Sequence, residues 1–437
     1  MTKTIKIDPV TRLEGHSTVT LKLGPNNTVE DVQFNVSSTR FFEKFLEGRN
    51  AEHAPRIAPR ICGICPIPHH LASVKAVEAA WDVKIPRPAW KLRELLINAK
   101  QLSSHVIHIA ALQLPDLLAG PLAPPEKRNL VAIINALPDV GKAAIEAMKF
   151  GQELCATIGG KAIHPTTCIP GGVAKPLLEE ERDAYLKRLD RLIEIGKVIV
   201  DLGNKLVNDY MDVITKIGTV PTYYCGLVTK DKKELTIWDG LWRIMDTEGK
   251  IVAEVEPKDY MQVAAEYVAP HSMATHVYYR PAGYPEGIWR ANCLARVNVA
   301  EDMQTPWAKE LLAEFRKVCG RPSHFVFSYI WARIIETIQA VEKIKILLED
   351  PEIVSTDVKT VDVEPKEGNG VGMVEAPRGS LIHNYWTDDK GIITKANLIV
   401  ATNNNIGGIE KTLKQVAKQI FEQNILKDIT LPEPMIK

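Results

Sequence analysis

The chain has 437 residues, of which 45% are hydrophobic and 25% charged, and its formal net charge is zero. This is an ordinary globular composition, and a balanced charge without a basic run argues against nucleic-acid binding. No stretch approaches the roughly 18 consecutive apolar residues that a membrane span needs, and the N-terminus lacks the apolar segment of a signal peptide. Seven scattered cysteines argue against a disulfide framework, so we expect a cytoplasmic protein without membrane contact.

The first 36 residues predict strands. Apolar and polar residues alternate over 18–23 and again over 29–36, with a Gly-Pro-Asn-Asn turn between them, which predicts a β-hairpin. The preceding stretch 8–16, Asp-Pro-Val-Thr-Arg-Leu-Glu-Gly-His, is by composition alone a loop with solvated charges. Residues 40–49 predict a short amphipathic helix that ends at a glycine, on which Glu43 alone would be one more surface carboxylate.

Residues 60–69, Arg-Ile-Cys-Gly-Ile-Cys-Pro-Ile-Pro-His, carry a C-x-x-C pair that leads into a predicted helix. A helix N-terminus lowers thiol pKa values, and thiolates bind soft transition metals. Taken alone, the pair is half of a zinc site, a redox pair or two small core residues. The zinc interpretation wants a second C-x-x-C, which the sequence lacks, and the thioredoxin-like one wants a preceding strand, which residues 51–59 do not resemble.

Helices dominate the middle of the chain. Apolar stripes at helical spacing predict helices over 92–112, 126–154 with a break at Pro138, 177–217, 306–318 and 323–348. His105 and His108 on the first of these are interpreted as hydrogen-bonded core or interface histidines. The Gly- and Pro-rich stretch 159–172 predicts a tightly packed loop, in which Cys168 is interpreted as a structural thiol.

Short strands are predicted from about 220 to 280, with a hairpin turn at 246–250. A polar linker then leads to Glu-Ala-Pro-Arg-Gly-Ser-Leu-Ile-His at 375–383, where Arg378 alone would be an ordinary salt-bridged arginine. Ile-Val-Ala-Thr-Asn-Asn-Asn at 399–405 is a strand followed by a polar turn.

Taken together and in this order, these motifs resemble the large subunit of [NiFe]-hydrogenases. The resemblance covers almost the whole chain. It implies an α+β, predominantly α, hydrogenase large-subunit fold with peripheral β-hairpins. We expect a single domain over 1–437 with a β-rich excursion at about 220–280, packed on a small subunit that carries iron–sulfur clusters.

The resemblance also implies roles for individual residues. Cys62 would be a terminal ligand of nickel, and Cys65 would bridge it to an Fe(CN)2(CO) unit. Glu14 would pass protons to and from the metals, and Glu43 would bind a magnesium ion. The remaining expected cofactor contacts are Arg378, donating to a cyanide or substrate, Thr402, offering its hydroxyl to a cyanide, and Arg60 and His69.

Among the branches of the family, the motifs look most like the cytoplasmic F420-non-reducing (methyl-viologen-reducing) hydrogenases, which work with heterodisulfide reductase in methanogenic archaea. One family motif is missing. Members carry Asp-Pro-Cys-x-x-Cys-x-x-His near their C-terminus, whereas here no cysteine follows Cys319 and no histidine follows His383. The centre needs four thiolates, of which this sequence offers two.

Three hypotheses follow. The favoured one is an active hydrogenase whose second motif is supplied by a separate short polypeptide, with selenocysteine in place of one cysteine; selenolate suits nickel because it is softer than thiolate. The second is a structural large-subunit paralogue in an electron-transfer complex, without a working Ni–Fe centre. The third is a quinone-site subunit like that of respiratory complex I, a group that generally lacks the cysteine pair.

Overall fold

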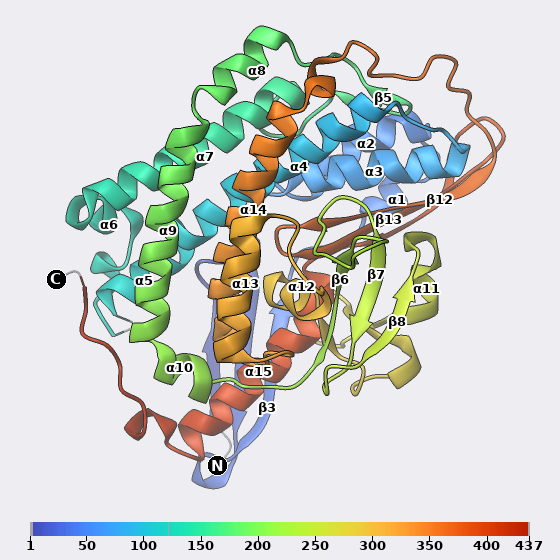
Figure 1. Ribbon diagram of the computed structural model, residues 1–437. Coiled ribbons are helices and arrows are strands. Elements are labelled where there is room, and N and C mark those ends of the chain that lie inside the picture. Colours follow the sequence, from blue (N-terminus) through green and yellow to red (C-terminus); the bar gives the residue numbers. More distant parts are fainter. Residues whose placement is uncertain (1–2, 121, 436–437) are drawn as a thin grey trace.

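Helix α3 (Pro66–Trp81) begins directly after the C-x-x-C motif and lies on a sheet formed by the last part of the chain (Figure 1). The computed structural model describes residues 3–120 and 122–435. The sheet is antiparallel, in the order β12 (Gly368–Ala376), β13 (Gly379–Thr387) and β14 (Ile393–Ile399).

A row of glycines lets α3 approach this sheet at backbone distance. Gly368, Gly370 and Gly372 occupy alternate positions of β12, so all three face the same way. A Cβ added at any of them would collide with backbone atoms of α3, namely those of Ala80, Ala76 and Ala72 in that order. Side chains larger than hydrogen are therefore excluded where the helix crosses the strand.

The spacing of these contacts is set by geometry. Four helix residues rise about 6.0 Å and two strand residues span about 6.6 Å, so each step of two along β12 matches one of four along α3. Because the contacts run from Ala80 down to Ala72 as β12 runs from 368 up to 372, the helix and the strand are antiparallel. The N-terminus of α3 therefore lies at the end of β12, just before Arg378.

The remaining helices form a packed layer around the long helix α4 (Arg87–Ile107). In this layer α4 packs on α7 (Pro138–Gly159) and α14 (Tyr329–Glu349), and α14 in turn packs on α9 (Leu189–Asp209) and α13 (Pro306–Cys319) (Figure 1). The other helices are α1 (Phe42–Leu46), α2 (Ala54–Ile57), α5 (Leu114–Ala119), α6 (Leu130–Ala136), α8 (Glu179–Leu186), α10 (Met211–Lys216), α11 (Tyr260–Val263), α12 (Cys293–Val299) and α15 (Asn403–Phe421). Most of the buried apolar side chains belong to this layer and form one continuous core.

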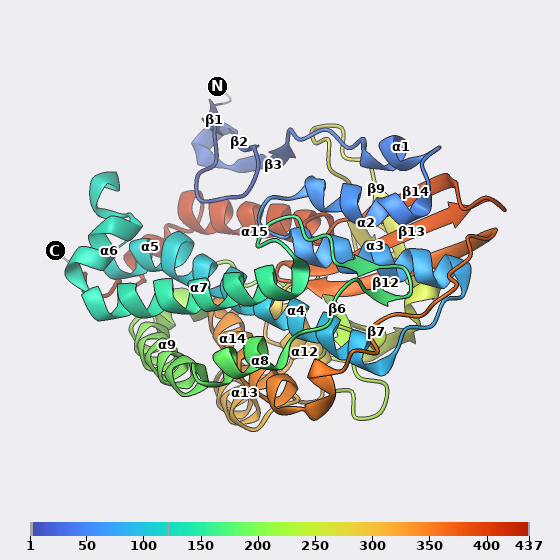
Figure 2. The ribbon, with the colours of Figure 1, turned by 90° about the horizontal axis from the view of Figure 1, so that it is seen from above.

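Small sheets surround the helical layer. The strands β1 (Lys3–Ile7), β2 (Ser17–Leu23) and β3 (Val29–Val36) form an antiparallel sheet that packs on α15 (Figure 2). A four-stranded sheet has the order β11 (Trp289–Arg290), β6 (Tyr223–Val228), β7 (Leu241–Met245) and β8 (Ile251–Val255), and only its β11–β6 pair is parallel. Two strand pairs complete the set: β9 (Ala264–Tyr267) with β10 (His276–Tyr279), and β4 (Cys168–Ile169) with β5 (Gly172–Val173).

The predicted N-terminal hairpin, the helix break at Pro138 and the hairpin turn at 246–250 are confirmed. The prediction of one helix over 177–217 is wrong, because the chain forms α8, α9 and α10 with breaks at 187–188 and at Tyr210. The helix predicted from 323 begins at 329 after a short 3-10 turn. Helix α15 was not predicted, and the single-domain organisation stays a prediction.

The helix predicted to end at 112 changes its hydrogen bonding near that end. Residues His108–Gln113 form a π-helical turn, η4, between α4 and α5. No helix in the described ranges 3–120 and 122–435 is both long enough and apolar enough to cross a bilayer.

We expect Gly370→Ala to destabilise the chain, because the new methyl group would meet backbone atoms of Ala76 and Ala80 that cannot rotate away. Overpacking of this kind costs about 1–3 kcal/mol, which urea denaturation of the purified chain would measure. Gly63→Ala is the matched control, since a Cβ there meets nothing within 4 Å. Equal stability of the two variants would contradict the close helix–strand contact.

Candidate metal centre

The cysteine pair lies between a 3-10 turn, η3 (Ala58–Ile61), and the first turn of α3. Cys65 is the N-cap residue of α3, and its backbone N–H donates to Cys62 Sγ at 3.2 Å. The two Cα atoms are 5.4 Å apart, and the structure joins the sulfurs as a disulfide, so metal binding requires its reduction to two thiolates. The residues before the pair form helical turns rather than a strand, which argues against a thioredoxin-like motif.

Glu14 reaches the same place from the N-terminal loop. Its Oε1 lies 3.9 Å from Cys62 Sγ, and the side chain is exposed to solvent. The loop is held by Arg12, whose guanidinium donates to Asp116 Oδ2 on α5 at 2.9 Å and also to the carbonyl of Arg128. A stretch that looked like a solvated loop is therefore an anchored one, and it places a carboxylate beside a thiol.

Arg378 occupies the turn between β12 and β13, at the end where the N-terminus of α3 lies. Its Nη1 is buried and has no hydrogen-bond partner among the described residues. Burial lowers the pKa of Arg378 to about 10, the charge of Arg333 acts in the same direction, and Glu14 opposes it. The guanidinium therefore stays charged at neutral pH with a free buried donor, which fits an anionic or hydrogen-bond-accepting group.

A buried ion network fixes the turn that carries Arg378. Arg296 donates to both oxygens of Glu336 at 2.6 and 2.7 Å and to Glu375 at 3.0 Å. It also donates to the carbonyls of Ala376 and Pro377, at 3.1 and 3.4 Å. One arginine thus satisfies two buried carboxylates and two carbonyls immediately before Arg378.

The two carboxylates of this network titrate differently. Burial alone would raise the pKa of Glu336, but the charge and hydrogen bonds of Arg296 and the hydrogen bond from His105 lower it to about 2. Burial raises the pKa of Glu375 to about 7 despite Arg296 and the hydrogen bond from Ser380. His105, which also faces Arg333, is the hydrogen-bonded core histidine that the sequence predicted.

Positive charge exceeds negative charge around Arg378. Lys100 on α4 and Arg333 on α14 are 7% and 3% exposed. Within the described part of the chain, neither they nor Arg378 has a carboxylate oxygen within 4.0 Å. Burial lowers the pKa of Lys100, and the nearby Arg378 adds to that effect. Buried cations without partners are costly, so this region is suited to hold negative charge from another source.

Two predicted cofactor contacts are engaged with protein groups. His69 is buried on α3, with its Nδ1 3.1 Å from His383 Nε2, and His383 Nδ1 is 2.7 Å from the Tyr385 hydroxyl. Burial lowers the pKa of His69 to about 3, so the ring is neutral. Arg60 is exposed, and its Nη1 lies 3.0 Å from Nδ1 of His164. The Gly- and Pro-rich loop therefore meets the cysteine motif through this contact.

Thr402 is exposed and lies at the N-terminus of α15, and the two asparagines that follow hold the Arg378 turn. Asn405 Nδ2 donates to the carbonyl of Arg378 at 2.9 Å, and Asn404 Nδ2 donates to that of Ser380 at 2.8 Å. Sequence reasoning selected Thr402 and missed both asparagines. Their position in a run of three, directly after a strand, was the available signal.

Glu43 on α1 occupies a polar hollow lined by β9 and β14. Its carboxylate accepts the backbone N–H of Leu398 at 2.8 Å and is held by Arg40 at 2.6 and 2.8 Å. Glu266 binds the same arginine at 2.6 Å. A magnesium ion at Glu43 would have to displace the Arg40 guanidinium, and the magnesium role stays a prediction.

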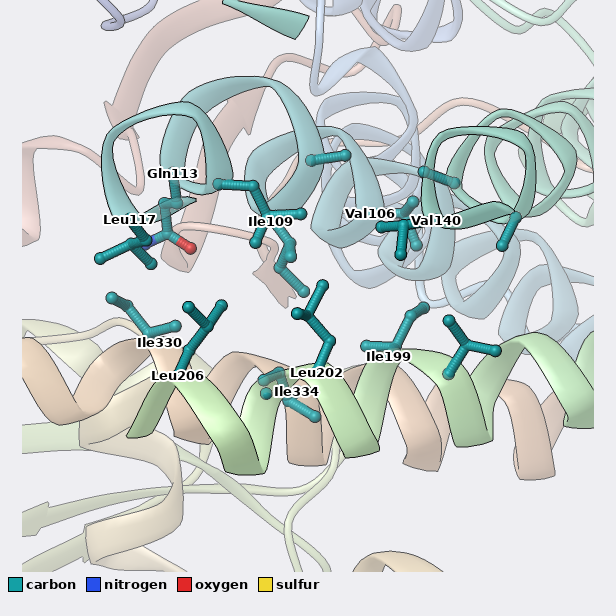
Figure 3. Close-up of a pocket in the computed structure, with 16 residues that line it drawn as sticks. Val106, Ile109, Gln113, Leu117, Val140, Ile199, Leu202, Leu206, Ile330 and Ile334 are labelled. Atoms are coloured by element: carbon teal, nitrogen blue, oxygen red, sulfur yellow. The ribbon is translucent and has the colours of Figure 1, made fainter. Parts of the chain in front are cut away.

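A second cavity lies far from this chemistry. Side chains of α4, η4 and α5 face those of α7, α9 and α14 across it (Figure 3). Its lining is apolar apart from Gln113 and contains no residue that titrates. Such a cavity offers no group for acid–base or metal chemistry, so the cysteine pair remains the candidate site.

Comparison with known proteins places the chain among hydrogenases. The sequence profile described as nickel-dependent hydrogenase matches residues 40–119, and a profile described as HoxL-like matches 4–38. The corresponding vhu subunit of the F420-non-reducing hydrogenase of Methanocaldococcus jannaschii is 50% identical, with 96% of this chain and 99% of that protein aligned. The vhu and vhc counterparts in Methanococcus voltae are 48% and 41% identical, aligned over 99% and 89% of their lengths and 96% and 97% of this chain.

Solved structures agree with these relatives and confirm the expected fold. An NAD+-reducing [NiFe]-hydrogenase in the H2-reduced state has a TM-score of 0.91 at 32% identity, covering 99% of this chain and 95% of that one. The Ni-Fe-Se hydrogenase from D. vulgaris Hildenborough has a TM-score of 0.79 at 24% identity, with 96% and 98% covered, which shows a shared fold.

We expect only Cys62 and Cys65 to react with iodoacetamide in the folded, phosphine-reduced chain. Both are partly exposed, whereas the other five thiols are buried. Burial also raises their pKa values, to about 12 for Cys155 and about 11 for Cys168 and Cys319, so few thiolates form at about pH 8. Intact mass should show two adducts before denaturation and seven after it. A Cys62→Ser, Cys65→Ser chain should show none when folded, and a third adduct on the folded parent would contradict the assignment.

Proposed function

Because the chain belongs to the nickel-dependent hydrogenase large-subunit family, we propose that it is the large subunit of an F420-non-reducing hydrogenase, an oxidoreductase that interconverts hydrogen with protons and electrons. The observation that carries the proposal is the placement of two neighbouring cysteines beside an acidic side chain and a buried arginine with a free donor. The 50% identity to the Methanocaldococcus jannaschii relative supports the F420-non-reducing type.

The residues present fit the nickel–iron centre that membership of this family implies. Cys62 and Cys65 would hold it as thiolates, since soft donors suit nickel. A bis-cyanide centre on thiolates is anionic, and the unpartnered cations Lys100, Arg333 and Arg378 supply positive charge at this place. When bound, such a centre splits hydrogen into protons and electrons.

The chain's own groups then handle protons. Cys62 Sγ can pass a proton to Glu14 Oε1, 3.9 Å away, and the exposed Glu14 carboxyl can release it to water. Arg378 is placed to donate its free Nη1–H to an accepting ligand such as cyanide. The roles of His69, Arg60 and Thr402 toward the cofactor, and of Glu43 toward magnesium, belong to the same proposal.

Two further soft ligands must come from outside these 437 residues. Cys155, Cys168, Cys225 and Cys319 lie in other parts of the fold, and Cys293, which faces Arg333 and Glu336, is fully buried with its pKa raised by burial. We propose that a separate short polypeptide supplies them, with cysteine or selenocysteine as donor. The alignment to 99% of both vhu relatives, against 89% of the vhc relative, is consistent with that arrangement.

The proposed partners follow from the electron path. An iron–sulfur small subunit would accept the electrons on the side of the cysteine pair, and heterodisulfide reductase with its electron-transfer subunits would receive them. The cytoplasmic location stays a prediction.

The proposal is tested on the native complex. We expect nickel and iron in equal amounts, methyl-viologen-dependent hydrogen uptake, and a short cysteine- or selenium-bearing peptide in its mass spectrum. Cys65→Ser should remove nickel, whereas Cys319→Ser, at a buried thiol outside the site, should retain it. Active complex without nickel would contradict the proposal, and inactive complex without nickel would favour the structural paralogue.

We expect Glu14→Gln to slow hydrogen uptake by about 10²–10⁴-fold, because the amide keeps the shape of the carboxyl but carries no proton. Nickel content and the cyanide infrared bands should not change, since Glu14 holds no metal in this arrangement. Glu52→Gln is the matched control, an exposed carboxylate on the neighbouring turn η2 (Ala51–His53). Full activity in Glu14→Gln, or loss of nickel from it, would contradict the proton-transfer role.

A further inference from the structure

A second group of metal-binding residue types lies away from the cysteine pair, where the β9–β10 hairpin meets α15. His271 belongs to the loop of that hairpin, His276 is the first residue of β10, and Glu410 is on α15. Each offers one nitrogen or oxygen atom, and these atoms all lie within 4.8 Å of one another. Three segments that are distant in sequence therefore direct their ligand atoms to one point.

His276 has an unsatisfied nitrogen at this point. Its side chain is fully buried, and its Nδ1 lies 3.2 Å from the hydroxyl of Tyr284. Its Nε2 is also buried and has no partner among residues 3–120 and 122–435. A buried ring nitrogen without a partner costs free energy, whereas one held by a second group at Nδ1 is the usual arrangement of a metal-ligating histidine.

Glu410 is held in the orientation of a ligand. Its Oε2 accepts the backbone N–H of Phe34 on β3 at 2.9 Å and lies 2.7 Å from Nε2 of His271. His271 and Glu410 are 22% and 20% exposed, so solvent reaches one side of the group and water can complete a coordination shell. The cluster is thus buried on the His276 side and open on the other.

The distances suit one small divalent ion. Zinc binds nitrogen and carboxylate oxygen at about 2.0–2.2 Å, which in a tetrahedral site separates ligand atoms by about 3.3–3.5 Å. The observed separations, from 2.7 Å up to 4.8 Å, bracket that value, so side-chain rotations suffice. Two imidazoles and one carboxylate match the preference of zinc among the divalent metals.

We propose that His271, His276 and Glu410 form a zinc site, with water as the fourth ligand and a structural role. The ion would join the β9–β10 hairpin to α15 and, through the Phe34 bond of Glu410, to the N-terminal sheet. Because the first residues of α15 hold the Arg378 turn, the site would also brace the helix on which that turn depends. The proposal does not depend on the function proposed for the cysteine pair.

The test uses the full chain with Cys62→Ser and Cys65→Ser, so that the thiol pair cannot bind the probe. Zinc, titrated in competition with a chromophoric chelator, should bind one per chain. His276→Ala and Glu410→Gln should each weaken binding by at least about 100-fold, and Tyr284→Phe by about 10-fold, as for a group that supports a ligand. His53→Ala, at an exposed histidine outside the cluster, is the matched control and should bind zinc unchanged.

Glu410→Gln can keep the bond from Phe34 through its amide oxygen, so loss of zinc in a chain with unchanged circular dichroism would separate ligation from folding. X-ray absorption at the zinc edge should show nitrogen and oxygen donors only. A sulfur donor would place the ion at the buried cluster of His105, Cys293 and Glu336 and overturn the proposal. Zinc binding unaffected by Glu410→Gln, or absent at one equivalent, would leave His271 and Glu410 a plain ion pair and also overturn it.

Discussion

The close contact between α3 and β12 determines where the two main motifs of this chain lie. Three glycines at alternate strand positions let alanines of the helix touch the strand backbone, and the helix and the strand repeat over nearly the same distance. The contact joins a segment near residue 70 to one near residue 370. It brings the cysteine pair at one end of α3 to the arginine turn at one end of β12, although neither motif contributes to the contact.

Electrostatics complete what that contact begins. Arg296 neutralises Glu336 and Glu375 and holds the carbonyls before the turn, so the backbone under Arg378 is satisfied by protein groups. Lys100, Arg333 and Arg378 lie beyond this network without carboxylates of their own among the described residues. A fold that fully pairs its deepest charges and leaves a few cations unpaired beside two thiols is arranged for an anionic metal centre.

Much of this could be predicted from the sequence, because local patterns report local chemistry. The N-terminal hairpin, the helix after the C-x-x-C pair and the break at Pro138 each depend on residues close together in the chain. The motifs at 8–16, 60–69 and 375–383 identified Glu14, the cysteines and Arg378. The structure places all of them in one neighbourhood, through a thiol–carboxylate contact and shared charge effects.

What could not be predicted depends on pairings across the chain. Glu336 lies in an apolar helix stripe, and only the position of Arg296, 40 residues earlier, explains how it can be buried. The single helix expected over 177–217 fails because nothing in its periodicity marks the break at Arg188, where three-residue bonding replaces the helical pattern. Helix α15 begins with three asparagines and two glycines, which are poor helix formers, and it is stabilised by its packing on β3 and by the contacts of Asn404 and Asn405.

The matched repeat of α3 and β12 limits how this protein can change length during evolution. One residue inserted into α3 would turn the cysteine end of the helix by about 100°, and one residue inserted into β12 would turn its glycines to the other face of the sheet. Insertions that preserve the site must therefore come in whole helical turns or in strand pairs, or fall in the loops outside this contact.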